Sequence, residues 1–267
     1  MKEVLQHAGP IGFLAWRAGL ATLVLFVMLV VRREPLRPPP LGPTALIGVL
    51  QIALFGLLIQ WALVEGGAGR TALLTYTMPF WLLVLARFTL GERMARVQWA
   101  CIALAAIGLL LVIEPWRGLG GVASTAMALA AGICWALAVV VSKRLFARAG
   151  TVVTPLSLTT WQMLCGALVL VAVAAIVPER PIDWSAAFVG ALAYNALLAS
   201  SLAWLLWTWV VQQLPAGIAG LTSLAIPVCG VLFAWALLGE QPSLVEGVGI
   251  VLVAAALFGI TRAPATR

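Results

Sequence analysis

Charge is scarce in this sequence. Only 9% of the 267 residues are charged, whereas an ordinary soluble domain carries about 25%. Hydrophobic residues make up 63%. A soluble protein of this length could not cover its surface with so few charges, and the composition also excludes a disordered chain. The sequence therefore indicates a membrane protein that crosses the bilayer several times.

Motifs for catalysis and metal binding are lacking as well. The cysteines form no CxxC pair and are interpreted as small buried hydrophobic residues: Cys101, Cys134, Cys165 and Cys229. His7 is the only histidine, and no phosphate loop, nucleophile motif or metal-ligand spacing occurs. We expect neither an enzyme nor a metal or cofactor. The net charge of +7 is interpreted as a record of membrane orientation, not of nucleic-acid binding.

Nine apolar stretches are long enough to cross a bilayer, which takes about 20 residues. They are rich in Leu, Val and Ala and lack the alternation of strands, so the sequence predicts an all-α bundle. Short connectors hold most of the proline, glycine and charge. Numbered as spans one to nine, the stretches are 11–31, 43–64, 70–90, 95–113, 120–142, 153–177, 185–211, 216–238 and 244–261.

Lysine and arginine are distributed unevenly between the predicted loops. Ten lie on one side and four on the other, while Arg17 and Arg87 fall inside spans. Because cytoplasmic loops carry the excess of basic residues, the side with ten is predicted to be cytoplasmic. We therefore expect a multi-pass protein of the inner or plasma membrane, with its C-terminus in the cytoplasm and its first residue outside.

The sequence contains an internal repeat. Residues 68–92 and 216–240 align without gaps at a shift of 148 and share eight identical residues. These include a proline within the span and a Gly-Glu pair at its end: Pro79 and Pro227, Gly91-Glu92 and Gly239-Glu240. A shift of 145 aligns spans one and six, for example Trp16 with Trp161.

Spans one to four thus correspond to spans six to nine, and span five has no counterpart. The repeat unit has five helices, an odd number, so the two copies are inverted in the membrane. We expect a first repeat over residues 1–113, lacking its first helix, and a second over 120–261. Inverted repeats are typical of secondary transporters, which bind substrate near the bilayer midplane where the repeats meet.

The missing helix precedes span one. At the shift of 145, Met1 aligns with Phe146, just after span five. We interpret this as a misplaced start or a truncated chain rather than a real loss, because an N-terminus outside the cell without an export signal is unusual. An apolar stretch of about 20 codons upstream would restore the helix.

These features resemble the EamA family of the drug/metabolite transporter superfamily. The matching motifs are Pro79…Gly91-Glu92 followed by Gly108-Leu109-Leu110, and Pro227…Gly239-Glu240 followed by Ala256-Leu257-Phe258. Arg17 matches an arginine that is common in the second helix of the family's first half. The resemblance implies ten helices in two halves, cytoplasmic termini, and export or exchange of small metabolites such as amino acids.

Matching prolines and polar residues indicate where a substrate would bind. Pro79 and Pro227 are predicted to bend their helices, because proline removes a backbone hydrogen bond and clashes with the preceding turn. Ordinary packing kinks are the alternative. We expect the site between span seven and spans three and eight, with span five alongside. The predicted substrate-binding residues are Asn195, Tyr194, Ser201, Trp204, Thr75, Tyr76, Gln60, Trp61, Trp135 and Arg17.

Three of these residues are costly to place in a membrane. Asn195 and Gln60 carry amides, which also serve as contacts between helices. Arg17 lies about two turns inside span one, where an arginine costs about 2.5–3.5 kcal/mol on insertion scales. We expect Arg17 to reach the outer surface, to pair with a carboxylate, or to bind a substrate anion.

All nine acidic residues lie at or near span ends. Because intramembrane carboxylates usually mark proton-driven pumps, this placement argues against carboxylate-driven antiport. The sequence predicts a secondary transporter that exports or exchanges small neutral or zwitterionic metabolites by alternating access, with the lipid bilayer and a small-molecule substrate as its partners. The alternative is a truncated, non-transporting membrane paralogue that acts as a binding or regulatory partner. Homodimerisation, the substrate and the coupling ion stay open.

Overall fold

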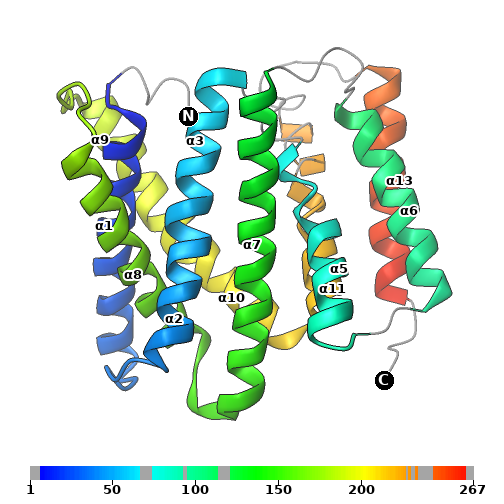
Figure 1. Cartoon of the computed structure of the whole chain (residues 1–267), viewed down its shortest axis with the longest axis horizontal. Coiled ribbons are helices and arrows are strands. Elements are labelled where there is room, and N and C mark those ends of the chain that lie inside the picture. Colours follow the sequence, from blue (N-terminus) through cyan, green and yellow to red (C-terminus); the bar gives the residue numbers. More distant parts are fainter. Residues whose placement is uncertain are drawn as a thin grey trace. The chain divides into compact units, whose positions relative to one another are not determined.

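A computed structural model describes residues 7–66, 74–92, 95–113, 121–226, 228–229, 232–233 and 243–262. These residues are mostly helical, and no strand occurs among them (Figure 1). The all-α fold predicted from the composition is therefore confirmed. Pro227 and the second Gly-Glu pair, Gly239-Glu240, lie outside the described residues.

Five helices of the described chain are long and apolar enough to cross a membrane. Three are continuous: α1 (Pro10–Val31), α7 (Val122–Ala149) and α8 (Pro155–Ile176). Two contain a π-helical segment: α2–η2–α3 (Leu41–Ile47, Gly48–Leu54, Phe55–Gly66) and α9–η5–α10 (Ala186–Tyr194, Asn195–Leu202, Ala203–Gln213). Three shorter helices are also apolar: α5 (Met78–Thr89), α6 (Arg96–Ile113) and α13 (Leu244–Arg262). The chain is a multi-pass helical membrane protein, and the count of nine spans stays a prediction.

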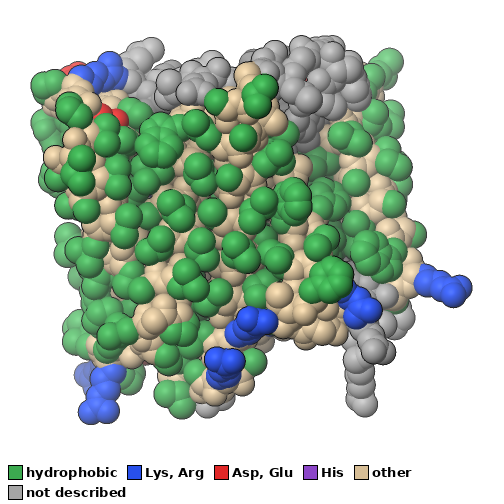
Figure 2. All heavy atoms as spheres, in the orientation of Figure 1, with side chains coloured by type: hydrophobic (Ala, Val, Ile, Leu, Met, Phe, Trp, Pro, Cys, Tyr) green, Lys and Arg blue, Asp and Glu red, His purple; other side chains and the backbone are tan. Residues whose placement is uncertain are grey.

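The outer faces of these helices are hydrophobic. On α1, the side chains of Leu23, Val27 and Val30 are exposed at helical spacing, as lipid contact requires. Figure 2 shows hydrophobic side chains between the helix ends, and Lys and Arg side chains near those ends.

The chain divides into two compact units. The first comprises Met1–Gln60 and Leu137–Leu214, and the second comprises Trp61–Ala136 and Pro215–Arg267. The first unit holds predicted spans one and two with their counterparts six and seven. Spans three and four belong to the second unit with counterparts eight and nine. Each unit thus combines corresponding helices from both predicted repeats.

Helix bounds in the first unit follow the same shifts as the sequence. α1 and α8 each have 22 residues and begin with a proline, Pro10 and Pro155, which lie 145 positions apart. The segments η2 and η5 also correspond at a shift of 148, except that η5 begins one residue earlier. Proline is well placed at a helix start, because the N–H it lacks would have no partner there.

Carboxylates of one repeat lie at helix starts of the other. Glu179 Oε1 and Oε2 accept hydrogen bonds from the backbone N–H groups of Ile11 (3.0 Å) and Gly12 (2.7 Å) at the start of α1. Its counterpart Glu34 accepts a hydrogen bond from the Thr154 hydroxyl (2.5 Å) at the start of α8. A negative charge at a helix N-terminus is stabilising, because it complements the helix dipole.

The two helix starts differ in one residue. Thr154 caps α8 with its own side chain, which accepts a hydrogen bond from Ser157 N–H at 3.1 Å. The counterpart of Thr154 is Gly9, which precedes α1 and offers no side-chain cap. A Cβ at Gly9 would overlap the side chain of Glu179. The missing side chain therefore leaves room for the Glu179 carboxylate to cap α1.

α8 packs closely against η2, and two glycines permit it. A Cβ at Gly48 would lie on the backbone oxygen of Gln162, and a Cβ at Gly166 would overlap Ile52. Because the two backbones approach so closely, side chains of α8 and η2 lie next to one another, and some of them line the cavity described below.

In the second unit, α6 packs along α13 and α5 packs against α11 (Ala216–Thr222). Glu92, from the first Gly-Glu pair, accepts hydrogen bonds from the backbone N–H groups of Ala216 (2.7 Å) and Gly217 (3.0 Å). Its carboxylate therefore has the same capping role at α11 that Glu179 has at α1.

Pro79 lies in the first turn of α5, after a turn at residues 76–77. The helical path is thus interrupted just before this proline.

Candidate functional site

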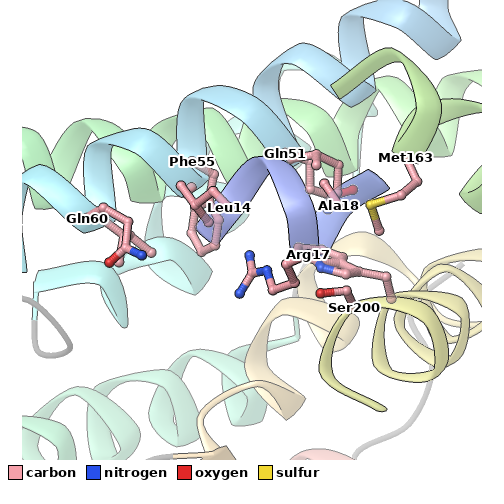
Figure 3. Close-up of a pocket in the computed structure, with 12 residues that line it drawn as sticks. Leu14, Arg17, Ala18, Gln51, Phe55, Gln60, Met163 and Ser200 are labelled. Carbon is pink, nitrogen blue, oxygen red and sulfur yellow. The ribbon is translucent and has the colours of Figure 1, made fainter. Parts of the chain in front are cut away.

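The first unit contains a cavity of about 130 Å³. This volume is close to the roughly 150 Å³ that holds a benzene-sized molecule in an engineered protein cavity. Six helical segments line it, and most lining side chains are apolar (Figure 3). The lining residues are Leu14, Arg17, Ala18, Gln51, Ile52, Phe55, Gly56, Ile59, Gln60, Met163, Ser200 and Trp204.

Both π-helical segments contribute to the lining. Gln51 and Ile52 lie in η2, and Ser200 lies in η5. A π-helical turn contains an extra residue and is frequently found at functional sites. The cavity therefore lies where both long helices depart from regular α-helical geometry.

Three polar side chains of the cavity have buried atoms that form no hydrogen bond with the described residues. In the described chain, Arg17 Nε, both amide atoms of Gln60 and Ser200 Oγ are buried without a hydrogen bond. Gln60 and Ser200 are each only 2% exposed. In Figure 3 the guanidinium of Arg17 lies between the side chains of Gln60 and Ser200. A buried polar group without a partner destabilises a protein by about 1–3 kcal/mol, so three in one cavity suggest a ligand.

A further polar contact beside the cavity joins two buried amides. Gln162 donates from Nε2 to Gln51 Oε1 at 3.4 Å. Nearby, the rings of Phe55 and Trp204 pack edge to face, with centroids 6.4 Å apart. One part of the wall is therefore aromatic, and another carries amides and a guanidinium.

The cavity lies among residues that correspond between the repeats. Ala18 corresponds to Met163 at a shift of 145, and Gly56 corresponds to Trp204 at a shift of 148. Arg17 corresponds to Gln162, so the two repeats differ in charge at this position. Inverted-repeat transporters bind their substrates where the repeats meet, and the cavity has this location within the first unit.

Of the predicted site residues in the first unit, Arg17, Gln60 and Trp204 line the cavity. Asn195 donates from Nδ2 to the backbone oxygen of Ala191 in its own helix (2.9 Å). Tyr194 is 62% exposed. Neither of these two residues lines the cavity.

Ser201 is also outside the cavity lining. It is buried, and its hydroxyl donates to the backbone oxygens of Ala196 (2.7 Å) and Ala21 (3.3 Å). The second of these contacts joins η5 to α1, so Ser201 connects two helices.

The other four predicted residues belong to the second unit. Thr75 and Trp135 are buried, Tyr76 packs against the core of α5, α6, α11 and α13, and Trp61 is 40% exposed. Their role in substrate binding stays a prediction.

Nine of the twelve lining residues were not predicted, among them Gln51, Ser200, Phe55 and Met163. A lone amide within an apolar run, the signal that singled out Asn195, would also have identified Gln51. Ser200 carries no such signal in the sequence.

A helical membrane bundle with a small, partly polar cavity between repeat-related helices is typical of secondary transporters. Comparison with known proteins gives the family. The model of the EamA-like transporter family matches residues 1–114 and 123–262, and the chain belongs to this family.

Relatives of known sequence are also named as transporters. The uncharacterized transporter YoaV of Bacillus subtilis is 24% identical, covering 97% of this chain and 89% of its own. The probable terminal-alkyne amino-acid exporter of Streptantibioticus cattleyicolor is 27% identical, with 97% and 86% covered. The probable amino-acid metabolite efflux pump of Salmonella typhimurium is 28% identical, with 72% and 66% covered.

A solved crystal structure has the same fold. It aligns with a TM-score of 0.83 at 19% identity and covers 97% of this chain and 90% of its own.

Proposed function

We propose that this EamA-family transporter exports or exchanges small neutral or zwitterionic metabolites, of the amino-acid type, by alternating access. The cavity of the first unit supports the proposal most directly, because it combines three unpartnered polar side chains with an apolar wall. Small-molecule sites typically combine a mostly apolar lining with a few polar groups that fix orientation. Two relatives named for amino-acid export point to the same substrate class.

We further propose that the C-terminus is cytoplasmic. In the first unit, the C-terminal ends of α1 and α7 lie at one end, because Glu34 bonds to Thr154 and Phe146 packs with Val153. The basic residues at this end include Arg32, Arg33, Arg37, Lys143, Arg144 and Arg148. Arg180 lies at the opposite end, where it donates to the backbone oxygen of Ala8. The excess of basic residues supports a cytoplasmic location for the first end.

Counterflow in proteoliposomes tests the function. Purified protein is reconstituted, the vesicles are loaded with an unlabelled neutral amino acid, and uptake of radiolabelled L-leucine or L-phenylalanine is followed. We expect uptake above protein-free vesicles. Absence of counterflow across the neutral amino acids would favour the non-transporting paralogue instead.

Variants of two glycines, one in the cavity and one outside it, make the test specific for the cavity. Gly56 lines the cavity, and only Leu14 lies near a Cβ placed there. Gly190, in α9, has nothing within 4 Å of such a Cβ. Gly56→Leu should fill the cavity and reduce counterflow at least about tenfold, which corresponds to about 1.4 kcal/mol. Gly190→Leu should leave counterflow unchanged. Equal activity of the two variants would place the substrate elsewhere.

A further inference from the structure

We propose that Arg17, Gln60 and Ser200 form a carboxylate subsite, so that the transported solutes are small monocarboxylates with an apolar side chain. The inference rests on the proposed function, because it names the chemical group by which the same cavity recognises its solute. Neutral amino acids belong to this class, and so do the matching hydroxy acids. Amides and amines of the same shape do not.

Arg17 has no acidic partner among the described residues of the first unit. The three described carboxylates of that unit bond elsewhere, at helix ends: Glu34 to Thr154, Glu179 to Ile11 and Gly12, and Asp183 to His7. None of the described residues that line the cavity carries a carboxylate. A positive charge inside a membrane-spanning helix is unfavourable without a counter-ion. A ligand with one negative charge would supply the missing partner.

The available donors match a carboxylate. A guanidinium presents its N–H groups in a planar fork that fits two carboxylate oxygens. The Gln60 amide and the Ser200 hydroxyl add further donors on either side of Arg17 (Figure 3). All three groups are supplied by different segments, α3, η5 and α1, so a bound carboxylate would join these segments.

The remaining lining residues determine which chemical group fits at the other end of the solute. Leu14, Ile52 and Met163 contribute aliphatic side chains, and Phe55 and Trp204 contribute rings. Such a surface favours an apolar side chain. Within the described part of the chain, the lining offers no carboxylate for an ammonium group, although Gln60 Oε1 is an available acceptor. The carboxylate is therefore the main determinant of binding, and the amino group is secondary.

Competition with matched compounds tests this assignment. Counterflow of radiolabelled L-leucine by the wild-type protein is measured against L-leucine, 2-hydroxy-4-methylpentanoate, L-leucinamide and 3-methylbutylamine, and the phenylalanine series is measured likewise. The two carboxylates should compete. The amide and the amine should compete at least about tenfold more weakly, because neither carries the negative charge and paired oxygens that form a bidentate ion pair with Arg17.

Variants link the discrimination to Arg17. Arg17→Gln should weaken competition by the carboxylates about 10- to 100-fold, and Arg17→Lys should retain part of the preference. Ser200→Ala removes one neutral donor and should weaken carboxylate competition about 3- to 10-fold. It provides the test if Arg17→Gln does not elute as a single folded species. Arg87→Gln is the matched control, because Arg87 is exposed in the last turn of α5, and it should change nothing.

The outcomes separate the inference from the proposed function. Counterflow with equal competition by L-leucine and L-leucinamide would overturn the carboxylate subsite and leave the transporter intact. Full carboxylate preference in Arg17→Gln, or in Ser200→Ala where Arg17→Gln does not fold, would overturn it as well. Failure of the wild-type protein to move either radiolabelled amino acid would contradict the proposed function, and the subsite with it.

Discussion

Glu179 offers a direct test of how carboxylates hold the helix starts. Its two oxygens accept hydrogen bonds from Ile11 and Gly12 at 3.0 and 2.7 Å. A hydrogen bond to a charged group contributes about 1.5–3 kcal/mol, and a neutral one contributes about 0.5–1.5 kcal/mol. Glu179→Gln keeps one acceptor oxygen and loses the charge that complements the helix dipole. We expect it to reduce stability by about 1.5–3 kcal/mol.

Its counterpart Glu34 provides the control. Glu34 contacts the Thr154 hydroxyl, and Thr154 itself caps α8 through Ser157. Glu34→Gln therefore leaves a capped helix and should cost less than half as much as Glu179→Gln.

Thermal unfolding of both purified variants in detergent, followed by loss of monodisperse protein, compares them. A decrease of roughly 3–10 °C in melting temperature is expected for Glu179→Gln. An unchanged melting temperature, or a larger decrease in Glu34→Gln, would refute the assignment of Glu179 as the cap of α1.

Two further predictions concern packing and orientation. Gly48→Ala should lower the melting temperature and the yield, because its Cβ would lie on a backbone oxygen of α8. Gly42→Ala is the control and should lower neither, because its Cβ would have no described atom within 4 Å. Equal melting temperatures for the two variants would argue against the close approach of η2 and α8. In a cysteine-free background, Asp183→Cys should react with an impermeant thiol reagent in intact cells and Arg148→Cys should not, and the reverse pattern would invert the proposed topology.

Much of the fold could be predicted from the sequence because it depends on local and repeated features. Long apolar runs identify the helices, and a constant shift in the sequence relates α1 to α8. The sequence also identified Arg17 and Gln60, since both are costly in an apolar run.

The cavity face of η5 could not be predicted in the same way. The sequence places Tyr194, Ser201 and Trp204 on one face only if the helix is regular. The π-helical segment adds residues to its turns and changes that face. As a result, Ser200 lines the cavity, Ser201 bonds to α1, and Tyr194 is exposed.

The helix starts that the carboxylates cap could not be predicted from the sequence either. Glu92 was recognised as part of a repeated Gly-Glu motif, but its contact with Ala216 joins residues that are 124 positions apart. Only the tertiary arrangement within the second unit shows that the motif ends one helix and caps another.

A structure of the protein with a transported amino acid bound tests the central claim most directly. The account predicts the solute in the cavity of the first unit, with its carboxylate within hydrogen-bond distance of Arg17 and its side chain against Phe55 and Trp204. A solute bound away from the lining residues, with the cavity empty, would contradict it.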